Sequence, residues 1–153
     1  MRIAVLADVH GNLPALEAVL AHLGRQGGCE EIWVLGDLAA FGPYPQETLE
    51  RLAALPQIRF VQGNTDRYLV TGVRPPQMAV ENEAEWKKLP GFLEERDANF
   101  RWTVQQLSYE WYSFLRGLPF QQRVEIPDYG PVLAVHASPL GDEVGIWEDT
   151  SDE

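Results

Sequence analysis

The sequence has little cysteine and no long apolar run, and each shortage excludes a class of protein. A single cysteine, Cys29, allows neither a disulfide within the chain nor a metal cluster held by several thiolates. No stretch approaches the roughly 18 consecutive apolar residues that a membrane-spanning helix needs. The first apolar run is also too short for the core of a signal peptide, because it meets Asp8 at once. We therefore expect a cytoplasmic protein with no membrane partner.

Basic residues are also scarce. The chain has 12 lysines and arginines against 23 aspartates and glutamates, which gives a formal net charge of −11. This charge repels nucleic acid and anionic membrane surfaces at long range, so we expect no nucleic-acid partner. A phosphate-bearing substrate would need a local positive charge, which a bound metal ion can supply.

The first half of the chain alternates between strand and helix patterns. At 153 residues, with 45% hydrophobic side chains, residues 1–153 are enough for a single domain with its own core. Apolar runs at 3–6, 32–35 and 58–61 predict buried strands. Helical patterns that begin near Leu13 and cover about 46–55 separate these strands. This alternation is typical of a parallel sheet that is covered on both faces.

The second half has a different pattern. Residues from about Met78 to Leu118 are helical and aromatic, and alternation over 121–126 and 131–135 predicts an antiparallel hairpin. The predicted fold class is therefore α/β, with mixed sheets flanked by helices. Three aromatic residues lie off the main apolar stripe of the helical region: Trp102, Tyr109 and Tyr112. They indicate either a helix buried on two sides or an exposed aromatic surface facing a substrate or another subunit.

Polar side chains follow four of the predicted strands, at the point where each strand ends. Open α/β sheets build their sites along the edge formed by the carboxyl ends of the strands, so these side chains can converge. The residues are Asp8, His10, Asp37, Asn64 and His136. Two carboxylates, two imidazoles and one carboxamide suit divalent transition metals better than calcium or a thiolate-bound structural zinc.

Four of these residues also have an ordinary structural explanation. Asp8 and Asp37 can cap helices, Asn64 can occupy a left-handed turn, and His136 can be a hydrogen-bonded core histidine. Four separate explanations would have to hold together at four strand ends, so a single metal site is the favoured interpretation.

The motifs resemble a known family. Asp8-x-His10, Gly36-Asp37, Gly63-Asn64-x-Asp66 and His136, in this order and spacing, are similar to the first four motifs of the calcineurin-like metallophosphoesterases. The similarity is greatest to the small prokaryotic phosphoesterases. It implies two mixed sheets flanked by helices and a centre of two divalent metal ions, with Mn or Fe favoured over Zn.

The resemblance also implies a role for each residue. Asp8 and His10 would bind the first ion, Asn64 and His136 the second, and Asp37 would bridge both and help to activate a water. Asp66 would orient a ligand or a water. Gly36 and Gly63 would allow the sharp turns that crowd the ligands together.

Two departures from the family pattern affect these expectations. Many relatives have a histidine, interpreted as the general acid, where this chain has Thr65, so the general acid is unknown. The family's final Gly-His-x-His motif is absent, because the three histidines are His10, His22 and His136. We therefore expect a domain that is incomplete at its C-terminus, about two-thirds of the family's length, with a loop over 142–153. An open sheet edge would favour a homo-oligomer.

The predicted function is hydrolysis of phosphomonoesters or phosphodiesters, with a small phosphate ester or a nucleotide as the substrate. The alternative is a catalytically weak or inactive scaffold that binds partners through the Trp102, Tyr109 and Tyr112 surface or through the open sheet edge. A nucleotide-binding α/β domain is disfavoured, because residues 8–13 contain neither a Gly-x-Gly-x-x-Gly motif nor a Walker lysine.

Overall fold

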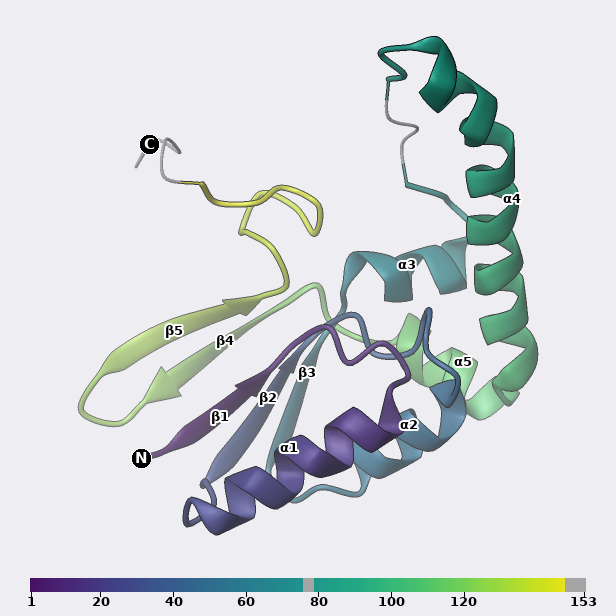
Figure 1. Ribbon diagram of the computed structural model, residues 1–153. Coiled ribbons are helices and arrows are strands. Elements are labelled where there is room, and N and C mark those ends of the chain that lie inside the picture. Colours follow the sequence, from purple (N-terminus) through teal and green to yellow (C-terminus); the bar gives the residue numbers. More distant parts are fainter. Residues whose placement is uncertain (76–78, 148–153) are drawn as a thin grey trace.

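Three parallel strands form the central sheet of the computed structural model, which describes residues 1–75 and 79–147. Their order is β1-β2-β3, and they comprise β1 (Ile3–Leu6), β2 (Glu31–Leu35) and β3 (Ile58–Val61). The helix α1 (Leu13–Arg25) connects β1 to β2, and α2 (Pro45–Ala53) connects β2 to β3 (Figure 1). Because a helix returns the chain after each strand, the carboxyl ends of all three strands lie along one edge. The predicted parallel sheet is confirmed.

The central strand β2 shows why this segment is almost continuously apolar. Ile32 and Val34 belong to the core on the helical side of the sheet, whereas Trp33 belongs to the core on the opposite side. Successive side chains of a strand point to opposite faces, so a strand covered on both faces needs apolar residues at every position.

Helices cover one face of the sheet. In addition to α1 and α2, they are α3 (Asn64–Thr71), α4 (Glu83–Gln106) and α5 (Tyr109–Arg116). Each helix contributes buried side chains to one core, among them Leu16, Leu49, Tyr68, Phe100 and Leu115. Local signals place the helix ends: Pro45 begins α2, where its fixed φ is favourable, and Gly72 ends α3 at a φ of 73°.

A hairpin covers the other face. β4 (Gln121–Ile126) and β5 (Gly130–Val135) pair in antiparallel fashion, and Val124 and Ala134 pack against Trp33 and Val61 of the parallel sheet. The parallel and antiparallel pairings that the sequence predicts therefore occur in two separate sheets (Figure 1).

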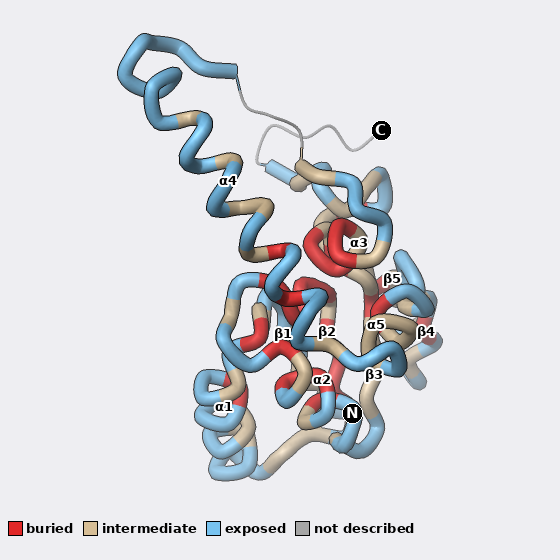
Figure 2. The backbone as a smooth tube through the Cα atoms, turned by 90° about the vertical axis from the view of Figure 1, so that its right-hand side faces the viewer, coloured by how far each residue is buried: buried red, intermediate tan, exposed pale blue. Residues whose placement is uncertain are grey.

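The helical region predicted for about 78–118 contains two helices instead of one continuous pattern. Ser108 interrupts it, because its side-chain oxygen accepts a hydrogen bond from the Trp111 N–H and begins α5. Met78 lies outside the described residues. The N-terminal half of α4 extends beyond the sheet and is largely exposed (Figures 1 and 2).

The row of Trp102, Tyr109 and Tyr112 is divided between the surface and the interior. Tyr109 is 75% exposed and Trp102 is 38% exposed. The Tyr112 hydroxyl is partly buried and donates a hydrogen bond to the Val70 carbonyl at 2.9 Å. Neither interpretation of this row, a doubly buried helix or an exposed aromatic surface, therefore describes all three residues.

The predicted loop at the end of the chain is present over 142–147, and residues 148–153 lie outside the described part. Among the described residues, no helix is both long enough and apolar enough to cross a membrane.

The core on the helical side gives a stability prediction. Leu49 of α2 is fully buried, so Leu49→Ala should lower the free energy of unfolding by about 2–5 kcal/mol. Val19 of α1 is 46% exposed, so Val19→Ala should change the free energy of unfolding by less than about 1 kcal/mol. Urea denaturation followed by circular dichroism measures both variants, and equal losses would contradict this packing.

Candidate metal centre

Three predicted ligands lie on the two loops that leave β1 and β2. Asp8, His10 and Asp37 have φ angles of 55°, 49° and 57°, in the left-handed region that non-glycine residues rarely adopt. Hydrogen bonds between the two loops hold this backbone: the Asp8 N–H donates to the Gly36 carbonyl, and the His10 N–H donates to the Asp37 carbonyl. Such strained conformations persist only where surrounding structure fixes them, and they concentrate at functional sites.

The side chains of these three residues meet. One ligand atom from each lies within 4.8 Å of the others. The Nε2 atom of His10 is 3.8 Å from Asp8 Oδ1 and 3.5 Å from Asp37 Oδ2. Its Nδ1 atom is 3.1 Å from the Ala40 carbonyl oxygen, so an Nδ1 proton is held there and the Nε2 lone pair faces the carboxylates. Two carboxylates and an imidazole lone pair repel one another unless a cation lies between them.

A second group lies on the other side of Asp37. His136 follows β5, and its Nδ1 atom is 2.6 Å from the Leu35 carbonyl oxygen. Its Nε2 atom is 3.0 Å from Asn64 Oδ1 and 3.7 Å from Asp37 Oδ1. With the proton on Nδ1, Nε2 is an acceptor that faces another acceptor. Either the Asn64 amide turns its NH2 group toward this nitrogen, or a cation lies against both atoms.

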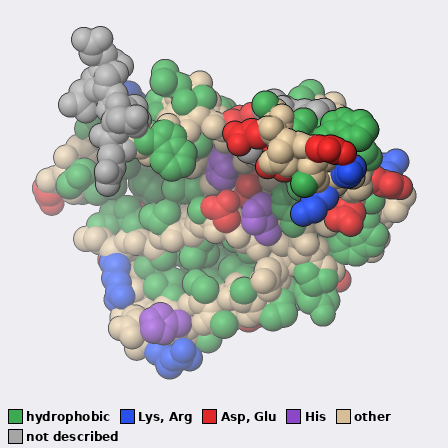
Figure 3. Space-filling view, turned by 45° about the horizontal axis from the view of Figure 1, so that its top comes forward, with side chains coloured by type: hydrophobic (Ala, Val, Ile, Leu, Met, Phe, Trp, Pro, Cys, Tyr) green, Lys and Arg blue, Asp and Glu red, His purple; other side chains and the backbone are tan. Residues whose placement is uncertain are grey.

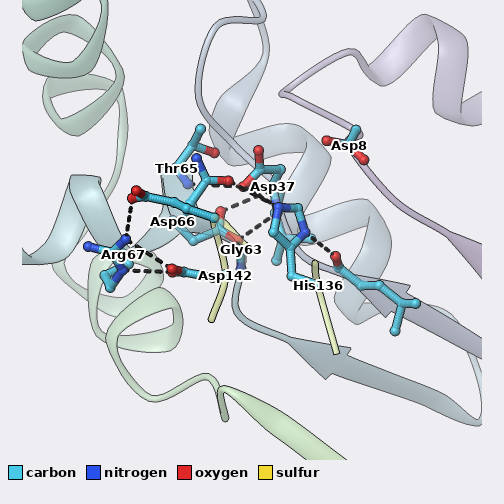
Figure 4. A network of polar contacts seen from close by, with 12 residues as sticks. Asp8, Asp37, Gly63, Thr65, Asp66, Arg67, His136 and Asp142 are labelled. Atoms are coloured by element: carbon cyan, nitrogen blue, oxygen red, sulfur yellow. Dashed lines mark hydrogen bonds and ion pairs between the residues drawn. The ribbon is translucent and has the colours of Figure 1, made fainter. Parts of the chain in front are cut away.

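Asp37 occupies the middle of the arrangement. Its side chain is 5% exposed, with one oxygen toward His10 and the other toward His136. Figure 4 shows Asp37 beside His136, with Asp8 on one side and Arg67 on the other. Figure 3 shows histidine and acidic side chains close together near the middle of one face of the molecule.

The buried carboxylate of Asp66 connects the ends of β2 and β3. Its Oδ2 atom accepts hydrogen bonds from the Asp37 N–H at 2.9 Å and the Gly63 N–H at 3.0 Å, and its Oδ1 atom accepts from the Leu38 N–H at 2.9 Å. Burial raises the pKa of Asp66 to about 7, with a smaller contribution from the charge of Asp37, while the three N–H donors act in the opposite direction. Asp66 therefore positions the backbone of Asp37.

Thr65 lies where the resemblance described above leads us to expect a histidine. Its N–H donates to Asp37 Oδ1 at 3.0 Å, which fixes the oxygen that faces His136. Its own hydroxyl is buried and has no hydrogen-bond partner among the described residues. Thr65 therefore acts on the site through its backbone.

Two glycines allow the strand ends to approach. Gly36 has a φ of 87°, and a Cβ atom there would lie 2.5 Å from the Gly63 Cα and 2.8 Å from His136 Nδ1. A Cβ atom on Gly63 would collide with the Asp37 carboxylate. Larger residues at either position would push the candidate ligands apart.

Sequence reasoning missed a cluster of polar residues beside the site, here called the Arg67 cluster: Arg67, Tyr68, Asp142 and Glu143. Arg67 Nε lies 2.7 Å from Asp142 Oδ2, and a second guanidinium nitrogen lies 2.6 Å from Glu143 Oε1. The Tyr68 hydroxyl donates to Glu143. The hydrogen bond to Asp142, followed by that to Glu143, raises the pKa of Arg67. The cluster connects α3 to the segment after β5. Arg67 and Asp142 are 75 positions apart in the sequence, so no local sequence pattern indicates the cluster.

The fold and the site define a class of α/β protein in which one sheet edge gathers carboxylates and imidazoles suited to divalent metal ions. Within that class, the chain belongs to the calcineurin-like phosphoesterase family, whose model matches residues 1–149. The predicted family is confirmed. Membership implies divalent metal ions, and the donor set described above fits them.

Individual proteins are similar over different parts of the chain. An uncharacterized protein of Methanocaldococcus jannaschii is 32% identical over 146 residues, which are 95% of this chain and 52% of that protein. A symmetrical bis(5′-nucleosyl)-tetraphosphatase of Serratia proteamaculans is 34% identical over 67 residues, which are 43% of this chain and 24% of that enzyme. The crystal structure of a hypothetical protein from Pyrococcus horikoshii matches with a TM-score of 0.73 and 25% identity, over 98% of this chain and 60% of that one. The chain thus spans about half the length of the Methanocaldococcus protein, whereas its match to the tetraphosphatase covers about a quarter of that enzyme.

The close approach at Gly36 gives a second stability prediction. Gly36→Ala should destabilise the protein by at least about 2 kcal/mol, because it combines a left-handed φ with a collision against Gly63. Gly24→Ala is the matched control, since a Cβ atom there meets nothing within 4 Å inside α1. This control should be neutral or stabilise by up to about 1 kcal/mol. Thermal unfolding measures the stability of both variants. Changes of the same sign and size would contradict the close approach of Gly36 and Gly63.

Proposed function

We propose that this chain hydrolyses phosphoesters at a centre of two divalent metal ions. Asp8 and His10 would hold one ion, Asn64 and His136 the other, and Asp37 would bridge them. The observation that carries this proposal is the position of the Asp37 carboxylate, whose oxygens lie 3.5 Å from His10 Nε2 and 3.7 Å from His136 Nε2. A carboxylate with one oxygen toward each imidazole suits a bridging ligand.

The surrounding residues support the proposal, because they fix the candidate ligands before any ion binds. Backbone carbonyls hold the Nδ1 atoms of His10 and His136, which turns both Nε2 atoms toward Asp37. Asp66 holds the Asp37 backbone, and the Thr65 N–H holds its Oδ1 atom. Preorganised ligands lose little conformational freedom on binding.

When bound, two such ions would neutralise the phosphoryl oxygens and lower the pKa of a water for attack. The chain's own residues keep the ligands in place and keep Asp37 largely away from solvent. Mn, Fe and Zn all suit this mixture of nitrogen and oxygen ligands, and we favour Mn or Fe.

The substrate class that we propose is a phosphate ester, with nucleotides included. Similarity to a bis(5′-nucleosyl)-tetraphosphatase supports a nucleotide, although it covers 43% of this chain. Thr65 cannot act as a general acid near neutral pH, so the rate should depend strongly on how stable the leaving oxyanion is.

Metal binding tests the role of Asp37. Isothermal titration of chelator-stripped protein with Mn²⁺ should show binding, and Asp37→Asn should weaken it at least tenfold, since even partners outside the ligand set contribute about 10–100-fold. Asp128→Asn removes the same charge in the turn of the hairpin and should leave the affinity unchanged. Equal affinities for the wild type and Asp37→Asn would refute the bridging role.

Hydrolysis of para-nitrophenyl phosphate and of its bis ester tests the reaction. Chelator-stripped protein should be inactive and should gain turnover when Mn²⁺ is added. Phenyl phosphate, with its poorer leaving group, should react at least tenfold more slowly in the absence of a general acid. If the protein binds Mn²⁺ but hydrolyses none of these esters, the proposed hydrolase activity would be contradicted and a binding scaffold favoured.

A further inference from the structure

A cavity of about 760 Å³ opens beside the candidate metal centre. It lies between α3, the N-terminal half of α4 and the segment after β5. Asn64 is part of its wall, and so is Ala137, the residue directly after His136. A phosphoryl group held by Asn64 and His136 would therefore have its organic substituent at the mouth of this cavity.

The interior of the cavity is largely apolar. Tyr68 contributes from α3, and Leu89, Phe92 and Leu93 contribute from successive turns of α4. Phe92 is 61% exposed, so its ring faces solvent along much of its surface. A planar group that covers such a ring removes apolar surface from water, and this makes the free energy of binding more favourable.

The charged groups of the wall are balanced. Arg67 forms ion pairs with Asp142 and Glu143 and offsets one of their two negative charges. Glu85, Lys88 and Arg96 also line the cavity, so three carboxylates and three cations, with Arg67 included, leave the wall without a formal net charge. Lys88 forms no ion pair among the described residues, and Arg96 lies 3.4 Å from Asp97. A balanced wall around an apolar interior suits a neutral organic group, while the charged phosphate is better placed at the metal centre.

We propose that this cavity binds the planar aromatic group of the phosphoester, a group of nucleoside size, while the phosphoryl group occupies the metal centre. The proposal rests on the proposed function for the position of the phosphoryl group. The volume lies in the range of about 300–1,000 Å³ that is usual for small-molecule sites. The cavity therefore selects the substrate by the organic group that the phosphate carries. Substitution of Phe92 tests this contact.

Binding without metal separates this proposal from the proposed function. Ligand-observed NMR and isothermal titration on the chelator-stripped full chain should detect binding of adenosine, and should detect no binding of ribose 5-phosphate, which lacks a base. Phe92→Ala should weaken adenosine binding about tenfold, which is a usual contribution of one stacking contact to a base. Titration with 2-naphthol tests selectivity: a site for any planar group would bind both adenosine and 2-naphthol, whereas a site selective for nucleosides would bind adenosine alone. Binding of adenosine supports the proposal in either case.

Trp86→Ala is the matched control. Trp86 is also on α4, is 62% exposed, and does not line the cavity. Both substitutions put a strong helix former at an exposed position, so both variants should fold, as circular dichroism would show. Absence of adenosine binding, or equal weakening by both substitutions, would overturn the proposal.

Kinetics provide the second measurement. Thymidine 5′-(para-nitrophenyl phosphate) and methyl para-nitrophenyl phosphate release the same leaving group, so they differ in the group that the cavity would bind. With Mn²⁺ present, Phe92→Ala should raise KM for the thymidine ester about tenfold and leave KM for the methyl ester unchanged. Hydrolysis of neither ester would count against the proposed function, and the metal-free titrations would still decide whether the cavity binds the base.

Discussion

The buried carboxylate of Asp66 is the interaction on which the rest of the site depends. Its three N–H donors come from the residues that follow β2 and β3, so one side chain fixes the separation of two strand ends. The position of Asp37 follows from that separation, and the two imidazoles are arranged around Asp37. A buried polar group with every partner present is rigid, whereas the loss of one partner leaves a desolvated charge, so this junction has little freedom to vary.

The sequence predicts those parts of the molecule that depend on local physics. Apolar runs locate β1, β2 and β3, and the central strand β2 is apolar over 32–35 because both of its faces are covered. The polar residues of the candidate metal centre lie directly after such runs, because the chain leaves the core there. The ligand roles remain predictions. Features that depend on distant contacts were not predictable: the Arg67 cluster joins residues some 75 positions apart, and the hairpin occupies its own sheet.

In the proposed function, bound metal ions would let the acidic chain accept an anionic substrate. The formal charge of −11 repels phosphate at long range, and Asp8 and Asp37 add to that repulsion at the site. Bound divalent ions would reverse the sign of the charge locally, so substrate binding and metal binding would be coupled. The adjoining cavity contributes little net charge, because Lys88, Arg96 and the neighbouring Arg67 match its carboxylates in number. Recognition would thus be divided between the ions for phosphate and the cavity for the organic group.

The central claim is that Asp37 lies between two metal ions. Anomalous diffraction from crystals of the full chain soaked in Mn²⁺ tests it most directly, because the scattering peaks locate the ions independently of activity. We predict two peaks about 3.5–4 Å apart, one on each side of the Asp37 carboxylate. One peak should adjoin Asp8 and His10, and the other Asn64 and His136. Soaked crystals with no peak in contact with Asp37 would contradict the account.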